Sequence, residues 1–132
     1  MSYYPTLEAV RKLSGQGNLI PVYQEIDADL ETPVSAYLKV ARPPYSFLLE
    51  SVEGGERMAR YSFIGTEPYQ VLKTGKGQPG GAVDPLVPIK AEMDKYKLIP
   101  VPDLPRFHGG AVGYLAYDVV RYFEPRLPEP PT

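Results

Sequence analysis

A carboxylate and a hydroxyl, Glu50 and Ser51, stand side by side at the end of the apolar run Phe47-Leu48-Leu49. A short continuous apolar run bounded by turn residues is typical of an interior strand, so we expect this one to be buried on both faces. At the mouth of such a strand, a carboxylate can accept hydrogen bonds from an ammonium group while an apolar slot takes a hydrophobic side chain. The pair is therefore a candidate site for a free amino acid.

A simpler interpretation of the same pair is a solvated strand end followed by a turn. The glycine-rich stretch 53–56 comes directly afterwards, and serine and glycine are favoured in turns. For an isolated Glu-Ser pair this simpler interpretation is the favoured one. Other segments of the chain have to decide between the two.

A run rich in glycine and tyrosine, Gly-Gly-Ala-Val-Gly-Tyr-Leu-Ala-Tyr-Asp at 109–118, is the second informative segment. Glycines within a strand mark close backbone approach or bends. Two further blocks are Ala-Arg-Tyr-Ser-Phe-Ile-Gly at 59–65 and Asp-Pro-Leu at 84–86. Taken in chain order, Leu-Leu-Glu-Ser at 48–51, these two blocks and the run at 109–118 closely resemble the N-terminal domain of anthranilate synthase component I, in the chorismate-utilising enzyme family. The resemblance covers nearly the whole chain.

The resemblance implies an α+β fold of antiparallel sheets packed orthogonally with flanking helices, part of the sandwich of chorismate-utilising enzymes. It implies that residues 1–124 form the N-terminal domain and that the proline-rich residues 125–132 are a linker towards a catalytic domain. The family's chorismate-binding and magnesium-binding residues lie in a C-terminal portion, so no catalytic residue can be carried onto this chain. We therefore interpret the chain as a fragment that is inactive alone.

The resemblance also implies an activity for the complete subunit, which makes anthranilate and pyruvate from chorismate and glutamine-derived ammonia in tryptophan biosynthesis. Mg²⁺ is implied for the complete enzyme, with no cofactor and no metal ligand expected in this chain. The implied partners are the C-terminal chorismate-binding domain of the same subunit, the glutamine amidotransferase subunit and L-tryptophan. Regulation and assembly are the roles left for this domain.

The family's tryptophan feedback site uses the serine of Leu-Leu-Glu-Ser, which is Ser51 here. The resemblance extends the expected effector site to the neighbouring Glu50 and Leu49, and to Arg60, near the position of a basic residue in some relatives. Two alternatives stay open. One is the same domain of aminodeoxychorismate synthase component I, in the folate pathway, and the other is a docking domain for the amidotransferase whose effector pocket is vestigial.

Composition narrows the setting. The net charge is -2, with acids and bases spread along the chain, which indicates neither a nucleic acid nor an anionic membrane as a partner. The absence of cysteine excludes disulfides and thiolate metal sites. The N-terminus lacks a secretory pattern, and no apolar stretch approaches the length of a membrane span, so we predict a cytoplasmic protein.

Two apparent signals are discounted. The stretch 75–80 matches the glycine spacing of a dinucleotide fingerprint, but Pro79 lies inside it and no helix opens on its third glycine, which favours a hairpin tip or flexible loop. His108 is the one histidine of the chain and has neither a cysteine nor a carboxylate cluster beside it. We expect it to be an ordinary loop residue.

The coarse pattern mixes helices and strands. A capping hydroxyl at Thr6 and the cap-plus-proline signals Thr32-Pro33 and Asp84-Pro85 mark three helix starts. The predicted helices end near 13, 40 and 96, and a short fourth helix starts at 118. The predicted strands cover 19–26, 45–52, 61–64, 69–73 and 110–117.

Overall fold

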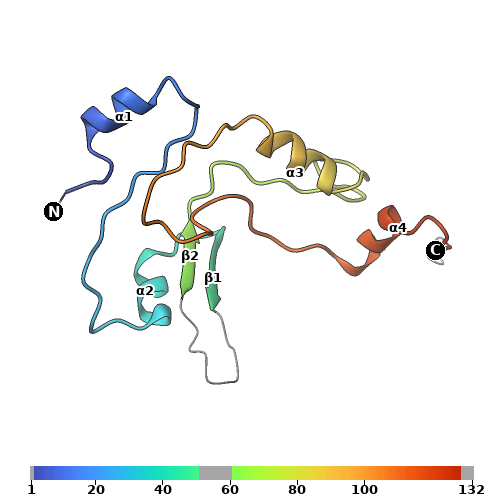
Figure 1. The fold of residues 1–132 in the computed structure, drawn as a ribbon. Coiled ribbons are helices and arrows are strands. Elements are labelled where there is room, and N and C mark those ends of the chain that lie inside the picture. Colours follow the sequence, from blue (N-terminus) through green and yellow to red (C-terminus); the bar gives the residue numbers. More distant parts are fainter. Residues whose placement is uncertain (1, 51–60, 129–132) are drawn as a thin grey trace, which may run out of the picture. The chain divides into compact units, whose positions relative to one another are not determined.

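The computed structural model describes residues 2–50 and 61–128 (Figure 1). Over these residues the protein is α+β, with four α-helices, one 3₁₀ turn and one two-stranded antiparallel sheet. The chain divides into two compact units. Glu25–Val71 forms the hairpin unit, and Met1–Gln24 together with Leu72–Thr132 forms the split unit.

Helix α2, Pro33–Val40, is the helix of the hairpin unit. The Thr32 hydroxyl accepts a hydrogen bond from the Ser35 backbone N–H at 3.1 Å, and the Ser35 hydroxyl accepts one from the Thr32 N–H at 2.9 Å. This reciprocal capping box, with proline at the first helical position, satisfies amide donors that a helix start otherwise leaves unpaired. The predicted start and end of this helix are confirmed.

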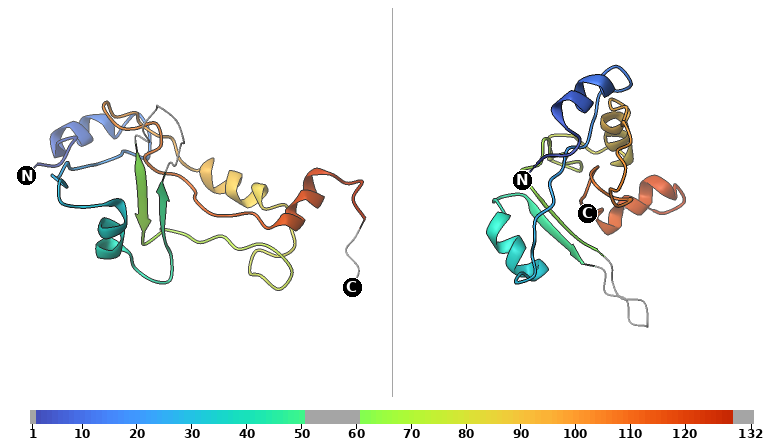
Figure 2. Two further views of the ribbon diagram at one scale, coloured as in Figure 1. Left: turned by 90° about the horizontal axis from the view of Figure 1, so that it is seen from below. Right: turned by 60° about the vertical axis from the view of Figure 1, so that its left-hand side comes forward.

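The sheet of the hairpin unit pairs β1, Ser46–Glu50, with β2, Ser62–Thr66. Its antiparallel register sets Ser46 opposite Thr66 and Glu50 opposite Ser62. Helix α2 packs against both strands and lies beside them in two views (Figures 1 and 2). The strands predicted at 45–52 and 61–64 are thereby confirmed, although each begins one residue later than predicted and β2 extends to Thr66. Residues 51–52 lie outside the described residues.

The split unit contains α1, Leu7–Leu13, and α3, Leu86–Met93. The Thr6 hydroxyl caps α1 by accepting from the Ala9 N–H at 3.3 Å, as predicted. The carboxylate of Asp84 accepts from the N–H of the first residue of α3 at 2.9 Å. Helix α3 ends three residues earlier than predicted. The backbone N–H groups of residues 95 and 96 donate to carbonyls three positions earlier, as in a 3₁₀ turn, and do not continue the α-helix.

The last elements of the split unit are the 3₁₀ turn η1, Tyr117–Val119, and the short helix α4, Val120–Phe123. They confirm the short helix predicted from position 118. Arg121 lies in α4, within 3.7 Å of the Asp118 carboxylate one turn earlier. No helix in the described part of the chain is both long enough and apolar enough to cross a membrane.

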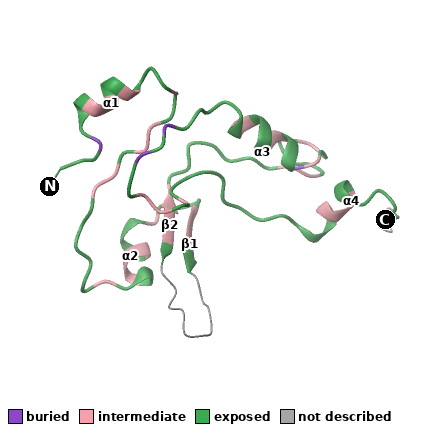
Figure 3. Cartoon of the chain, viewed as in Figure 1, coloured by how far each residue is buried: buried purple, intermediate pink, exposed green. Residues whose placement is uncertain are grey.

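Two segments far apart in sequence meet in the split unit. Leu19 and Leu98 form a parallel bridge, and the Ile99 N–H donates to the Leu19 carbonyl at 2.9 Å. Ile99 is 2% exposed and Val101 is 9% exposed, and Pro5 and Pro85 are the other buried residues in the described part of the chain (Figure 3). The small core of this unit therefore lies directly after the bridge.

Three strand predictions are wrong. The segment 19–26 forms bridges at Leu19 and Tyr23 without becoming a strand, and 69–73 and 110–117 form no strand. A strand needs a hydrogen-bonded neighbour over several residues, which apolar patterning does not guarantee. In the third segment, Gly110 has φ +136°, a conformation that a regular strand does not use.

Candidate functional site

The candidate site of the sequence lies at the end of β1. Leu49 and Glu50 are the last residues of this strand, paired with Phe63 and Ser62 respectively. Successive side chains of a strand leave on opposite faces, so Glu50 shares its face with Leu48 rather than with Leu49. Any ligand held by the Glu50 carboxylate would therefore meet the apolar surface of Leu48 first.

The prediction of a strand buried on both faces is wrong for β1. Phe47 and Leu48 are half-buried, and Leu49 is 45% exposed (Figure 3). Within the described residues of the hairpin unit, α2 is the element that packs on the strands, and one helix cannot cover both faces of a sheet. The end of β1 is thus an exposed surface that carries an apolar and a charged side chain, and it is not an enclosed pocket.

Two of the predicted site residues, Ser51 and Arg60, lie outside the described residues. The structure therefore places Leu49 and Glu50 alone, as neighbours at an exposed strand end. The effector role of all four residues stays a prediction.

The opposite end of the hairpin is tied by polar contacts. The Tyr37 hydroxyl of α2 lies 2.8 Å from the Ser46 hydroxyl at the start of β1. The Arg42 backbone N–H donates to the Thr66 hydroxyl at the end of β2, at 3.0 Å. These bonds connect α2 and the segment after it to both strands, so the hairpin is anchored at the end remote from Glu50.

Side-chain fit adds to these bonds in the middle of the hairpin. The Phe47 ring lies over Gly65, its direct partner across the sheet. A Cβ placed on Gly65 would come within 2.1 Å of the ring. Aromatic rings commonly cover strand glycines in this way, and the cover protects the exposed glycine backbone.

Charge in this unit concentrates before α2. The Glu31 carboxylate accepts from the Ser35 hydroxyl at 2.6 Å and pairs with the Lys39 ammonium. Hydrogen bonds from Lys39 first, and from Ser35 second, lower the pKa of Glu31 below its ordinary value, with burial opposing the shift. The group is a helix-stabilising cluster, and none of its members belongs to the candidate site.

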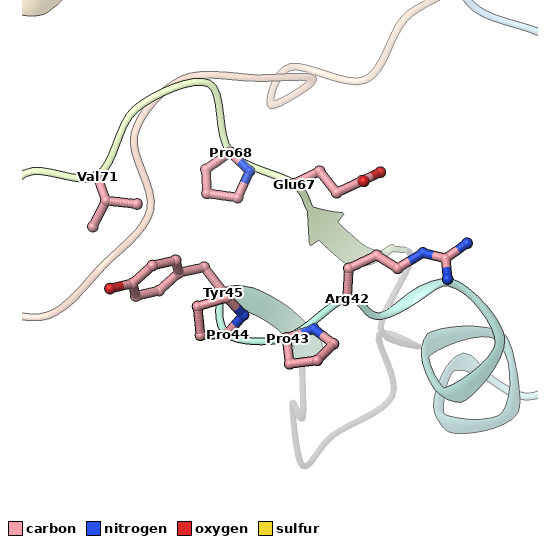
Figure 4. Close-up of a pocket in the computed structure, with 7 residues that line it drawn as sticks. All are labelled: Arg42, Pro43, Pro44, Tyr45, Glu67, Pro68 and Val71. Carbon is pink, nitrogen blue, oxygen red and sulfur yellow. The ribbon is translucent and has the colours of Figure 1, made fainter.

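A shallow hollow of about 260 Å³ lies where β1 begins and β2 ends. Figure 4 shows prolines on its two sides, the charged ends of Arg42 and Glu67 extending towards one rim, and Tyr45 and Val71 at the other. Every lining residue is exposed, so the hollow is a surface feature and not an enclosed site. It is separated from Glu50 by the length of β1.

Sequence reasoning missed this hollow. The prolines at 43, 44 and 68 flank the start of β1 and the end of β2. Glu67 adopts φ +50°, an uncommon conformation for a residue other than glycine. Prolines directly before the first predicted strand and directly after the second were the sequence feature that could have indicated this hollow.

The glycine-rich stretch of the split unit is a loop that bonds to itself. Four backbone amides donate to carbonyls within residues 73–81, those of Gly75, Gln78, Gly80 and Gly81. A phosphate cradle requires amides that point at the ligand, and these four are already used. The loop interpretation is therefore preferred to the dinucleotide fingerprint.

His108 lies in a loop, as predicted, with its Nδ1 atom 2.9 Å from the Pro105 carbonyl. Within residues 2–50 and 61–128, no three His, Cys, Asp or Glu side chains lie close enough together to hold a metal ion.

The fold and the candidate site define an α+β chain that contains an antiparallel hairpin with an exposed Leu-Glu end. Its sequence is similar to proteins named anthranilate synthase component 1. The anthranilate synthase component 1 of Acetivibrio thermocellus is 43% identical over 139 residues, covering 96% of this chain and 28% of that protein. The probable anthranilate synthase component 1 of Schizosaccharomyces pombe is 46% identical over 133 residues, covering 98% of this chain and 26% of that protein.

A third relative, anthranilate synthase component 1 of Neisseria gonorrhoeae, is 49% identical over 117 residues, covering 81% of this chain and 24% of that protein. The resemblance to the anthranilate synthase component I family is thereby confirmed over nearly the whole chain. The chain spans about a quarter of the length of these relatives. No family model matches the chain, and no solved structure gives a significant match.

Proposed function

We propose that this chain is the N-terminal regulatory and assembly domain of an anthranilate synthase component I, acting in the cytoplasm. The observation that carries the proposal is the identity of 43–49% to proteins of that name, along most of this chain and about a quarter of theirs. The domain would belong to the sandwich of chorismate-utilising enzymes, with residues 1–124 as its body and 125–132 as the linker.

The complete enzyme would convert chorismate and glutamine-derived ammonia into anthranilate and pyruvate. Its chorismate site and its Mg²⁺ would belong to the remainder of the subunit. The partners of this chain would be that C-terminal domain and the glutamine amidotransferase subunit. The chain alone would have no activity.

The regulatory part of the proposal concerns L-tryptophan at the end of β1. The Glu50 carboxylate and the Ser51 hydroxyl would accept hydrogen bonds from the tryptophan ammonium, with Leu49, on the opposite strand face from Glu50, and Arg60 as further members of the site. Glu50 is exposed at the strand end and so accessible to a ligand. A ligand held between two domains shifts their arrangement only by its difference in affinity for the two states, and this difference would produce feedback inhibition.

The test uses a chimaera in which this chain replaces the matching stretch of the Acetivibrio thermocellus relative. We expect L-tryptophan to inhibit anthranilate formation by the chimaera, and Ser51→Phe to relieve the inhibition because a ring would occupy the space of the ammonium group. Inhibition is measured as the ratio of rates with and without tryptophan. An unchanged ratio in the variant would remove Ser51 from the effector site.

Other assays separate the alternatives. Aminodeoxychorismate as the product of the complete parent enzyme would assign the chain to the folate-pathway enzyme, although every relative cited above carries the anthranilate synthase name. Gel filtration with the amidotransferase subunit, with and without tryptophan, tests the docking alternative. Binding of the subunit by a tryptophan-insensitive chimaera would favour a docking domain with a vestigial pocket.

A further inference from the structure

We propose that the contact between Phe47 and Gly65 is the positioning element that sets the exposed end of β1, and with it the response to the effector. The proposal rests on the proposed tryptophan site at Glu50. Neither residue would touch the ligand. Both would act by holding the strand that carries it.

The geometry leaves no room for a side chain at position 65. A Cβ there would lie 2.1, 2.4 and 2.9 Å from the Cε1, Cζ and Cδ1 atoms of the Phe47 ring. The Phe47 ring is rigid and cannot bend away from a new Cβ as a long flexible side chain could. The whole ring or the strand must therefore move. The absence of a side chain on Gly65 is therefore a requirement of this packing.

The contact selects one register. The residues on either side of Gly65 are Ile64 and Thr66, both β-branched, so the ring finds its opening at one position of this part of β2. A slip by one residue would bring the ring against a branched side chain and move every side chain of β1 to the other face. In the observed register Glu50 stands opposite Ser62.

The contact acts at a distance from the strand end. Strands rise about 3.3 Å per residue, so Phe47 and Glu50 are separated by about 10 Å along β1. The bond between Tyr37 and Ser46 fixes the other end of the strand, at 2.8 Å. A displacement at Gly65 is thus transmitted towards Glu50, since the remote end is anchored.

The experiment measures tryptophan inhibition of the chimaera in four variants. We expect Gly65→Ala to raise the half-inhibitory tryptophan concentration by about tenfold, which corresponds to about 1.4 kcal/mol of weakened effector binding. The compensating change Phe47→Leu removes the ring atoms closest to the new Cβ. The double variant should therefore recover most of the sensitivity that Gly65→Ala loses.

Two reference variants interpret the result. Gly15→Ala is the matched control, because its Cβ would meet nothing within 4 Å, and it should leave the sensitivity unchanged. Ser51→Phe tests the proposed function itself. If Ser51→Phe desensitises the enzyme and Gly65→Ala does not, the positioning role is wrong and the effector site stands. If Ser51→Phe remains fully sensitive, the effector site and the positioning role both fail.

A loss of activity in Gly65→Ala that Phe47→Leu does not reverse would also overturn the proposal. It would mean that the contact with the Phe47 ring is not what links position 65 to the effector response.

Discussion

In the hairpin unit, five consecutive residue pairs join β1 to β2, and an aromatic ring fits over a glycine in the middle of the ladder. In the split unit, segments nearly eighty residues apart are joined by the parallel bridge between Leu19 and Leu98, by backbone bonds from Asn18 and Leu19 to the Lys97 carbonyl, and by the Asn18 side chain. The hairpin has many backbone bonds, so steric fit is its most sensitive feature. The bridge has few, so a close approach or a single polar contact beside it matters more.

The largest effect on stability should come from Gly65→Ala in the hairpin unit. The new Cβ would meet a ring at 2.1 Å, and overpacking of this kind should cost about 3 kcal/mol. Urea unfolding followed residue by residue by NMR checks this, with Gly15→Ala as the control. If the NMR peaks of the hairpin unit show the same urea midpoint in the two variants, the packing of Phe47 on Gly65 does not limit stability.

The next effect should come from Gly17→Ala in the split unit. A Cβ there would lie 2.4 Å from the Lys97 carbonyl oxygen and 2.8 Å from the Ile99 side chain. The segments would have to separate, at a cost of about 2 kcal/mol. Hydrogen exchange of the Ile99 amide, which bonds to Leu19, should accelerate. Unaltered exchange at this amide would show that the close approach is unnecessary.

Asn18→Ala tests the polar clamp beside that glycine. The Asn18 amide group donates to the Lys95 carbonyl at 2.8 Å, and its oxygen accepts from the Lys97 N–H at 2.5 Å. Loss of both exposed bonds should cost about 1.5 kcal/mol. The same Ile99 exchange measures it, and the neighbouring change Gln16→Ala is the matched control. A variant indistinguishable from that control would mean that the bridge holds without the clamp.

Thr32→Ala should have a smaller effect, confined to the hairpin unit. It removes the hydroxyl that caps α2, and such a loss typically costs about 1 kcal/mol. Faster exchange of the Ser35 amide, which the hydroxyl accepts from, is the expected readout, whereas Thr32→Ser should preserve the cap. Equal exchange rates in the alanine and serine variants would contradict the capping role.

The smallest effect concerns pH. Because the pKa of Glu31 is lowered in the folded protein, its contribution to stability is present above the unfolded pKa and is lost as pH falls through the folded pKa. Acidification should therefore weaken α2 first at its start. Carboxyl-carbon NMR titration follows Glu31 directly, and Lys39→Met should raise its pKa towards the ordinary value. No rise in that variant would rule out the ion pair as the main cause.

Local signals predicted most of the helices. Thr6, Thr32 and Asp84 announce helix starts within a few residues, and the structure uses each of them. The strands at 45–52 and 61–64 were also predictable, since each carries an apolar run close to its partner in sequence. What could not be predicted was pairing at long range, such as that of Asn18 with Lys97, because no local pattern specifies a distant neighbour.

The candidate site was predictable as a position but not as an environment. Leu-Leu-Glu at the end of an apolar run indicated a strand end, and the structure places one there. Its exposure could not be read from the same residues, because burial depends on which elements cover the strand. The importance of Gly65 was hidden for a related reason, since it appears only when the register sets this residue against Phe47.

The most direct test of the central claim, that the end of β1 is a preformed half of an effector site, is an amide-resolved NMR titration of this chain with L-tryptophan. L-phenylalanine serves as the control ligand. We predict weak but selective shifts of the Leu49 and Glu50 amides with tryptophan and none with phenylalanine. Well-dispersed peaks that stay in place up to the solubility limit of tryptophan, or shifts confined to the hollow around Tyr45 and Val71, would contradict it.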